Sequence, residues 1–188
     1  MLTSGVKIGL GNAWIFMSVF ILQLIIISFA NKRIRKRSHV PPDTRKTNFE
    51  KYIGIFANLF WLLAMGYSIF LPLLLGTIWF YIGFTVFIFG VLLLLIATIN
   101  FMNTPGDQLI QKGVYKFSRH PMYLATFLIC LGSGIATASG IFIVLSLIFA
   151  LCLRYEALLE EKYCTNLYKD KYIEYKNKVP RWLGIPHR

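Results

Sequence analysis

The sequence has few charged residues and a large excess of apolar ones, which excludes an ordinary soluble domain. Only 15% of its 188 residues are Asp, Glu, Lys or Arg, whereas 56% are hydrophobic. A soluble domain of this length carries about 25% charged and about 45–50% apolar residues. Because so much apolar surface needs a nonpolar solvent, we expect residues 1–188 to form one integral membrane domain.

Cysteine is also scarce, and its pattern carries no metal or disulfide signature. Cys130, Cys152 and Cys164 are odd in number and form no C-x-x-C pair, so the sequence indicates neither a disulfide framework nor a zinc site. No small-residue cleavage pattern precedes the first apolar run, so we expect that run to be a retained span rather than a removed leader.

Acidic residues are outnumbered by basic ones. The chain has 8 Asp and Glu against 20 Lys and Arg, a formal net charge of +12. In a chain this apolar, the positive charge favours cytoplasmic loops beside anionic membrane lipids, and no nucleic-acid partner is expected.

Long apolar runs are what the sequence has in abundance. They predict an all-α fold, an integral membrane bundle of five transmembrane helices with an interfacial C-terminal helix. Pro72 marks a turn between the second and third runs, and Ser139-Gly140 makes a tight hairpin of the last two. The predicted spans are 12–30, 53–71, 73–99, 121–138 and 140–154.

Basic residues gather in the loops on one side of these spans. Positions 32–51 are dense in Lys and Arg, and further basic residues lie in segments 100–123 and 154–188, whereas the opposite turns are uncharged. The positive-inside rule therefore predicts an external N-terminus and a cytoplasmic C-terminus. Without a retention signal, we expect a multi-pass protein of a prokaryotic inner membrane.

Three groups of polar residues fall on the predicted cytoplasmic side. Pro121 suits the first turn of a helix, where its missing N–H would be unpaired anyway. Tyr123 follows His120 by one turn and shares its face. The groups are Arg119, His120, Pro121 and Tyr123 at the start of the fourth span; Glu156, Glu160 and Glu161 after the fifth; and Arg181 in the tail.

These side chains also have purely structural interpretations. Arg119 can be a topology anchor, His120 a helix cap, and the acidic pair Glu160-Glu161 a solvated helix face. Ionisable groups at a membrane boundary are costly to desolvate, so their presence there favours a site.

The order of these motifs resembles the isoprenylcysteine carboxyl methyltransferase family, part of a wider group of membrane methyltransferases that includes phospholipid N-methyltransferases. The similarity runs from Gly113 to Trp182. It rests on Arg-His-Pro-x-Tyr at 119–123, the tight apolar hairpin, Glu160-Glu161, Tyr172-x-x-Tyr175 and Val179-Pro180-Arg181.

This resemblance implies an enzyme that uses S-adenosyl-L-methionine to methylate a lipophilic or membrane-embedded acceptor. Carried over by motif, the cofactor-binding residues are His120, Pro121, Tyr123, Glu160 and Glu161. Arg119 and Arg181 would bind the cofactor carboxylate or place the substrate, since arginine suits a carboxylate. Glu156 is the candidate base should the acceptor be an amine.

Several alternatives stay open from the sequence. The acceptor can be a prenylcysteine carboxylate, a phospholipid amine, a small thiol or a hydrophobic phenol, and the oligomeric state is not indicated. A membrane reductase of the sterol-reductase type, or a non-catalytic lipid-binding protein, would also fit the composition. A non-catalytic protein predicts that the polar groups scatter, whereas the enzyme predicts that they converge at the inner leaflet.

Overall fold

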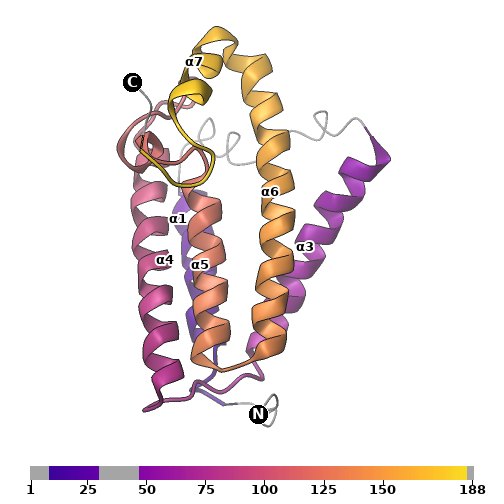
Figure 1. Cartoon of the computed structure of the whole chain (residues 1–188), viewed down its shortest axis with the longest axis vertical. Coiled ribbons are helices and arrows are strands. Elements are labelled where there is room, and N and C mark those ends of the chain that lie inside the picture. Colours follow the sequence, from indigo (N-terminus) through magenta and orange to yellow (C-terminus); the bar gives the residue numbers. More distant parts are fainter. Residues whose placement is uncertain (1–8, 30–46, 186–188) are drawn as a thin grey trace.

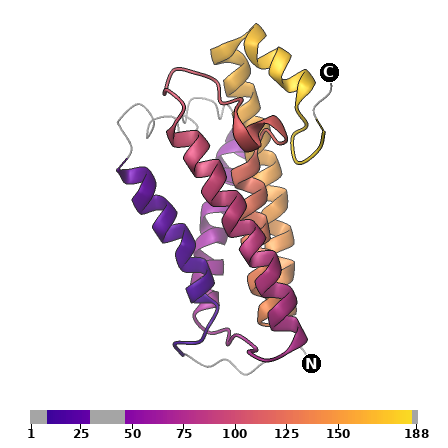
Figure 2. The same ribbon diagram turned by 90° about the vertical axis from the view of Figure 1, so that its left-hand side faces the viewer.

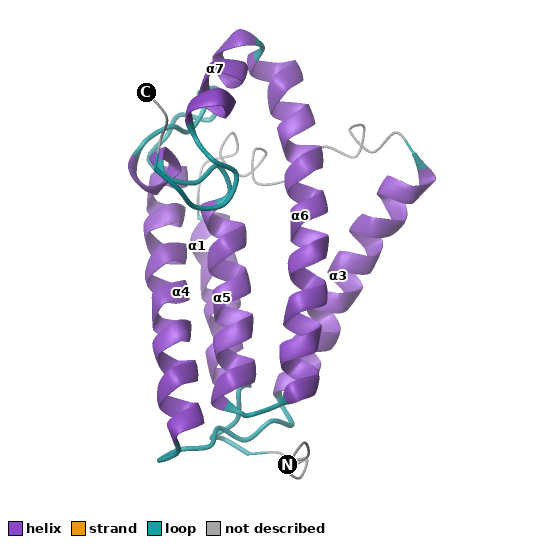
Figure 3. Ribbon diagram, in the orientation of Figure 1, coloured by secondary structure: helices purple, strands orange, loops and turns teal. Residues whose placement is uncertain are grey.

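The computed structural model describes residues 9–29 and 47–185, which form helices and no strand (Figures 1 and 3). Of the basic segment predicted at 32–51, residues 32–46 lie outside the described part. The helices are α1 (Trp14–Ser28), α3 (Asn48–Ser68), α4 (Ile78–Met102), the short 3-10 helix η2 (Gly113–Lys116), α5 (Pro121–Ala136), α6 (Gly140–Tyr168) and α7 (Asp170–Lys178).

Each predicted span contains one helix, but two helix starts differ from the predicted ones. Helix α3 begins at Asn48, five residues before the predicted start, because Thr47 and Glu50 form a reciprocal capping box. Helix α4 begins at Ile78 rather than at residue 73. Pro72 and Gly76, whose φ is +78°, shape a non-helical turn that ends at the N-cap Thr77.

Two of the described helices, α4 and α6, are long and apolar enough to cross a membrane by length and composition, whereas α1 and α5 are apolar but shorter. Apolar side chains are exposed along the outward faces of α4 and α6, as in lipid-facing helices. The structure thus supports an all-α, membrane-type fold. That the fold has five transmembrane spans stays a prediction from the sequence.

Close backbone contact joins α4 to α5. A Cβ added to Gly83 would lie 2.2 Å from the amide nitrogen of Ala136, and one added to Gly132 would lie 2.6 Å from that of Phe87. Small residues at these positions let the two backbones approach, as is common between membrane helices. Helix α5 therefore has a fixed position against α4, and its first residues have a fixed position at one end of the bundle.

The two ends of the bundle differ in character. The turns before α4 and between α5 and α6 lie at one end, and η2, α7 and the segment after α7 lie at the other (Figures 1 and 2). Helices α3 and α6 diverge toward the first residue of α3 (Figure 1). In the first turn of α3, Glu50 forms a 3.2 Å ion pair with Lys162 of α6. Most of the predicted site residues belong to the end that carries η2 and α7.

Helix α7 faces the protein with its aromatic side. Tyr172 and Tyr175 are buried with Val179, and Leu109 and Cys164 pack against them. The tyrosines of the helix that was predicted to be interfacial are therefore part of a small protein core above the bundle.

Candidate functional site

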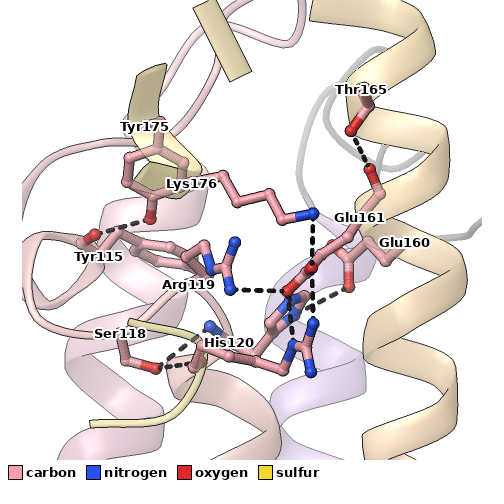
Figure 4. A network of polar contacts seen from close by, with 10 residues as sticks. Tyr115, Ser118, Arg119, His120, Glu160, Glu161, Thr165, Tyr175 and Lys176 are labelled. Atoms are coloured by element: carbon pink, nitrogen blue, oxygen red, sulfur yellow. Dashed lines mark hydrogen bonds and ion pairs between the residues drawn. The ribbon is translucent and has the colours of Figure 1, made fainter. Parts of the chain in front are cut away.

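The first residues of α5 and the distal part of α6 meet at His120. Its Nδ1 lies 3.4 Å from Oε2 of Glu160, and its Nε2 lies 3.2 Å from Oε1 of Glu161 (Figure 4). His120 precedes Pro121, the first residue of α5, and its backbone N–H donates to the Ser118 hydroxyl at 3.2 Å. The imidazole and the two carboxylates thus converge, as the enzyme hypothesis predicts and the scattered arrangement does not.

Glu161 is the buried counter-ion of this cluster, with 4% of its side chain exposed. Arg181 binds it through two parallel hydrogen bonds, from Nε at 2.8 Å and from Nη2 at 3.0 Å. Nη2 of Arg119 lies 3.3 Å away and Nζ of Lys176 4.0 Å away. Four basic side chains, that of His120 included, therefore contact one carboxylate.

These contacts change the protonation of both partners. Burial alone would raise the pKa of Glu161, but hydrogen bonds from His120 and Arg181 and the charge of Arg119 lower it to about 2. Burial alone would lower the pKa of His120, but hydrogen bonds to Glu160 and Glu161 raise it above its ordinary value. The cluster therefore favours an ionised carboxylate beside an imidazolium.

Glu160 is placed differently from its neighbour in the sequence, because 39% of its side chain is exposed. Hydrogen bonds with His120 and Tyr123 lower its pKa against the opposing effect of burial. The Tyr123 ring stacks on the imidazole, with centroids 5.4 Å apart and planes 3° apart. Glu160 is thus an ionised carboxylate that a ligand can reach.

Arg119 is a buried side chain of the cluster whose donors are not all used by the described residues. Its side chain is 8% exposed and contacts Glu161 through Nη2. Within the described part of the chain, its Nε and Nη1 are buried without a hydrogen-bond partner. Unpaired buried donors on a cation are costly, so this guanidinium is suited to an anionic group of a ligand.

The segment after α7 holds the cluster from the other side. The N–H groups of Arg119 and His120 donate to the carbonyls of Pro180 and Arg181, at 3.0 and 3.3 Å. The Ser118 hydroxyl donates to the same carbonyl of Arg181 at 3.2 Å. This backbone pairing brings Arg181, 20 residues after Glu161, back onto that carboxylate.

Two predicted site residues take less direct positions. Pro121 is fully buried as the first residue of α5 and shapes its start. Glu156 stands one turn before Glu160 on α6, half-buried and near enough to Tyr123 for their charges to interact.

Three further residues contribute to the cluster and were not predicted from the sequence, namely Ser118, Lys176 and Trp182. The Trp182 ring lies 6.3 Å from the His120 ring, on the segment whose backbone hydrogen-bonds with Arg119 and His120. Trp182 directly follows the Val-Pro-Arg motif and could have been found from that position. Lys176 offered no such signal, because its approach to Glu161 depends on how α7 folds back over α6.

Comparison with known proteins places the chain among membrane methyltransferases. Residues 71–171, just over half of the chain, match the family described as phospholipid methyltransferase. A stretch of 80 residues is 39% identical to the protein-S-isoprenylcysteine O-methyltransferase of Saccharomyces cerevisiae. This stretch is 42% of the present chain and 32% of the yeast protein, so the similarity spans about a third of that relative.

Proposed function

The chain belongs to the phospholipid methyltransferase family, and from that premise we propose that it is an S-adenosylmethionine-dependent methyltransferase with a lipophilic acceptor from the bilayer. The observation that carries the proposal is the buried Arg119 guanidinium, whose Nε and Nη1 have no partner among the described residues. Its neighbour in the sequence, His120, contacts the reachable carboxylate of Glu160 and stacks on Tyr123. The cluster thus holds the kinds of group that a cofactor with a carboxylate, an ammonium and a sulfonium needs.

The residues present fit S-adenosylmethionine, which when bound supplies an electrophilic methyl group on a sulfonium. Arg119 offers its two unused donors to the cofactor carboxylate. Glu160 offers an exposed, ionised carboxylate to the cofactor ammonium. Tyr123, stacked on His120, and Trp182 offer aromatic faces of the kind that attract a cation or flank a base.

Glu161 and Arg181 have a positioning role in this proposal. Both oxygens of Glu161 are already used by Arg181, and one of them also faces Arg119 and His120. Glu161 therefore sets the positions of the side chains around it rather than offering free acceptor capacity. Arg181 in turn fixes Glu161, so loss of either would misplace Arg119.

An anionic oxygen is the acceptor that the site favours. The yeast relative is named as an O-methyltransferase of S-isoprenylcysteine. In the present chain, four basic side chains contact Glu161, an excess of positive charge that attracts a carboxylate acceptor. An anionic acceptor that takes a methyl cation loses its charge, which a site of low dielectric favours. An amine acceptor would need a base, and Glu156 is the candidate.

The proposal places the site at the cytoplasmic face of a multi-pass protein whose N-terminus is external. The support is the Lys-rich character of the segments around η2 and α7. Residence in a prokaryotic inner membrane stays a prediction from the sequence.

Binding of S-adenosylhomocysteine to detergent-purified protein tests the proposal. Isothermal titration should show saturable binding, and Arg119→Lys should weaken it at least tenfold, because an ammonium cannot reproduce the paired donors. The matched control is Arg154→Lys, an exposed arginine on α6 outside the cluster, which should bind like the wild type. Absence of binding by folded wild-type protein, or equal affinity of the Arg119→Lys variant, would refute the proposed site.

A second assay tests the acceptor. Vesicles containing the protein are supplied with methyl-labelled S-adenosylmethionine and either N-acetyl-S-farnesylcysteine or phosphatidylethanolamine. We expect a base-labile methyl ester from the first acceptor and no label on the second. Label on the phospholipid amine alone would overturn the carboxylate assignment.

A further inference from the structure

An exposed apolar cluster lies beside the site, on the segment after α7. We call residues 179–185 the C-terminal strap. Leu183 and Ile185 of the strap are 72% and 86% exposed, and Phe117, on the segment that pairs with the strap, is 50% exposed. The Gly184 N–H donates to the Phe117 carbonyl at 3.1 Å, so these side chains belong to one structural unit.

The strap lies at the depth where the hydrocarbon of a membrane would end. The 21 residue steps along α6 from Gly140 to Glu161 rise by about 32 Å at 1.5 Å each, close to the roughly 30 Å thickness of a bilayer core. His120 contacts Glu161, and the strap pairs with the backbone of Arg119 and His120. Figures 1 and 2 both show the strap descending from α7 to the start of α5.

Helix α7 lies further out than the strap. It follows Tyr168, seven residues beyond Glu161 on α6, and it turns its tyrosines toward the protein. Among the described residues, the exposed apolar side chains at the boundary depth therefore include those of the strap and of Phe117. Exposed Lys112 and Lys116 stand on the same segment as Phe117, as basic residues do beside anionic headgroups.

We propose that the strap is a membrane-contacting element. Phe117, Leu183 and Ile185 insert at the boundary between headgroups and acyl chains of the cytoplasmic leaflet, and Lys112 and Lys116 face anionic headgroups. Since the strap also carries Arg181 and pairs with residues 118–120, its contact with lipid holds the positioning pair Arg181–Glu161 in place. The contact with lipid needs only that the protein resides in a bilayer, whereas the coupling to the site rests on the proposed function.

Spin labels on the strap and on α7 test the contact. The label is attached at Ile185→Cys or, as a matched control, at Ile173→Cys on α7, which is also an exposed isoleucine. Both variants also carry Cys164→Ser, because Cys164 is not buried and would react with the label. The other two native cysteines, Cys130 and Cys152, are buried. In nanodiscs containing anionic phospholipid, collisions of each label with oxygen and with a water-soluble nickel chelate are compared.

We expect the label at 185 to favour oxygen and the label at 173 to favour the nickel chelate. Equal nickel accessibility at both positions would overturn the proposal. So would a label at 185 that neither reagent reaches and that shows dipolar broadening, since a second copy of the chain would then cover the strap. The accessibility of the two labels does not depend on whether the protein binds S-adenosylhomocysteine. A failed lipid contact can therefore be told apart from a failed cofactor site.

Coupling to the site is tested in the same nanodiscs by titration with S-adenosylhomocysteine. Leu183→Ser with Ile185→Ser should weaken binding at least fivefold. The control, Leu167→Ser with Ile173→Ser, removes two exposed apolar side chains elsewhere and should leave binding unchanged. Equal affinity of the two double variants would overturn the coupling.

Discussion

Replacing Glu161 by glutamine removes the charge that holds the polar cluster together and keeps the shape of the side chain. The buried guanidinium of Arg119 and that of Arg181 would then face each other without this counter-ion, and His120 would keep Glu160 alone of its two carboxylate partners. Breaking a buried ion pair by removal of one partner costs about 3–5 kcal/mol. We therefore expect Glu161→Gln to lower the free energy of unfolding by about this amount.

The pKa of Glu161 gives a second route to the same magnitude. The cluster lowers this pKa from 4.5 to about 2. At about 1.4 kcal/mol per pKa unit, that difference corresponds to about 3 kcal/mol of stabilisation at neutral pH. Because the folded-state pKa is depressed, this stability is present above pH 4.5 and is lost as the pH falls toward 2.

Thermal unfolding in detergent measures the effect through intrinsic fluorescence. For a domain of this size, about 3 kcal/mol corresponds to a fall in Tm of roughly 6–12 °C. The control is Glu160→Gln, because that side chain is partly exposed and its ion pair, among the described residues, is with His120. We expect the Tm of this variant to fall by less than about 3 °C. Equal shifts in the two variants, or an unchanged Tm for Glu161→Gln, would refute the assignment of Glu161 as the buried counter-ion.

Three further predictions follow from the packing and the charges. Gly83→Ala should destabilise the bundle by about 1–3 kcal/mol, because its Cβ would overlap α5, whereas Gly66→Ala, with open space around it, should not lower the Tm. Tyr175→Phe should cost about 1–2 kcal/mol in the same assay, since it leaves the buried carbonyl of Tyr115 without its 2.7 Å hydrogen bond. The raised pKa of His120 means that its contribution to stability is complete below pH 6.5 and is lost as the pH rises through the raised value. Wild-type Tm should therefore fall on the alkaline side, and a His120→Gln variant that kept the same alkaline slope would contradict this.

The sequence was sufficient to predict that each apolar run contains a helix and that His120 and Glu161 converge. Hydrophobic length fixes where a helix can lie, and the tight hairpin at Ser139-Gly140 makes the last two runs antiparallel neighbours, so their polar ends must meet. The early start of α3 was also readable, because Thr47-x-x-Glu50 is a capping box in the sequence itself.

Other features depend on contacts between residues far apart in the chain. The pairing of Arg181 with Glu161 requires the strap to fold back along residues 117–120, which no local pattern indicates. The tyrosines of α7 have the composition of an interfacial belt, and only the position of the 109–115 segment beneath them decides that they pack on protein. Similarly, the different exposure of Glu160 and Glu161 depends on which neighbours surround each side of α6.

Photo-crosslinking tests most directly whether the cluster around His120 binds S-adenosylmethionine, as we propose. Purified protein is irradiated with radiolabelled S-adenosylmethionine, digested and mapped by mass spectrometry. We expect the label on peptides that contain Tyr123, Glu160 or Trp182, and its loss when excess S-adenosylhomocysteine is present. Competed label confined to peptides from α1 or α3 would contradict the account.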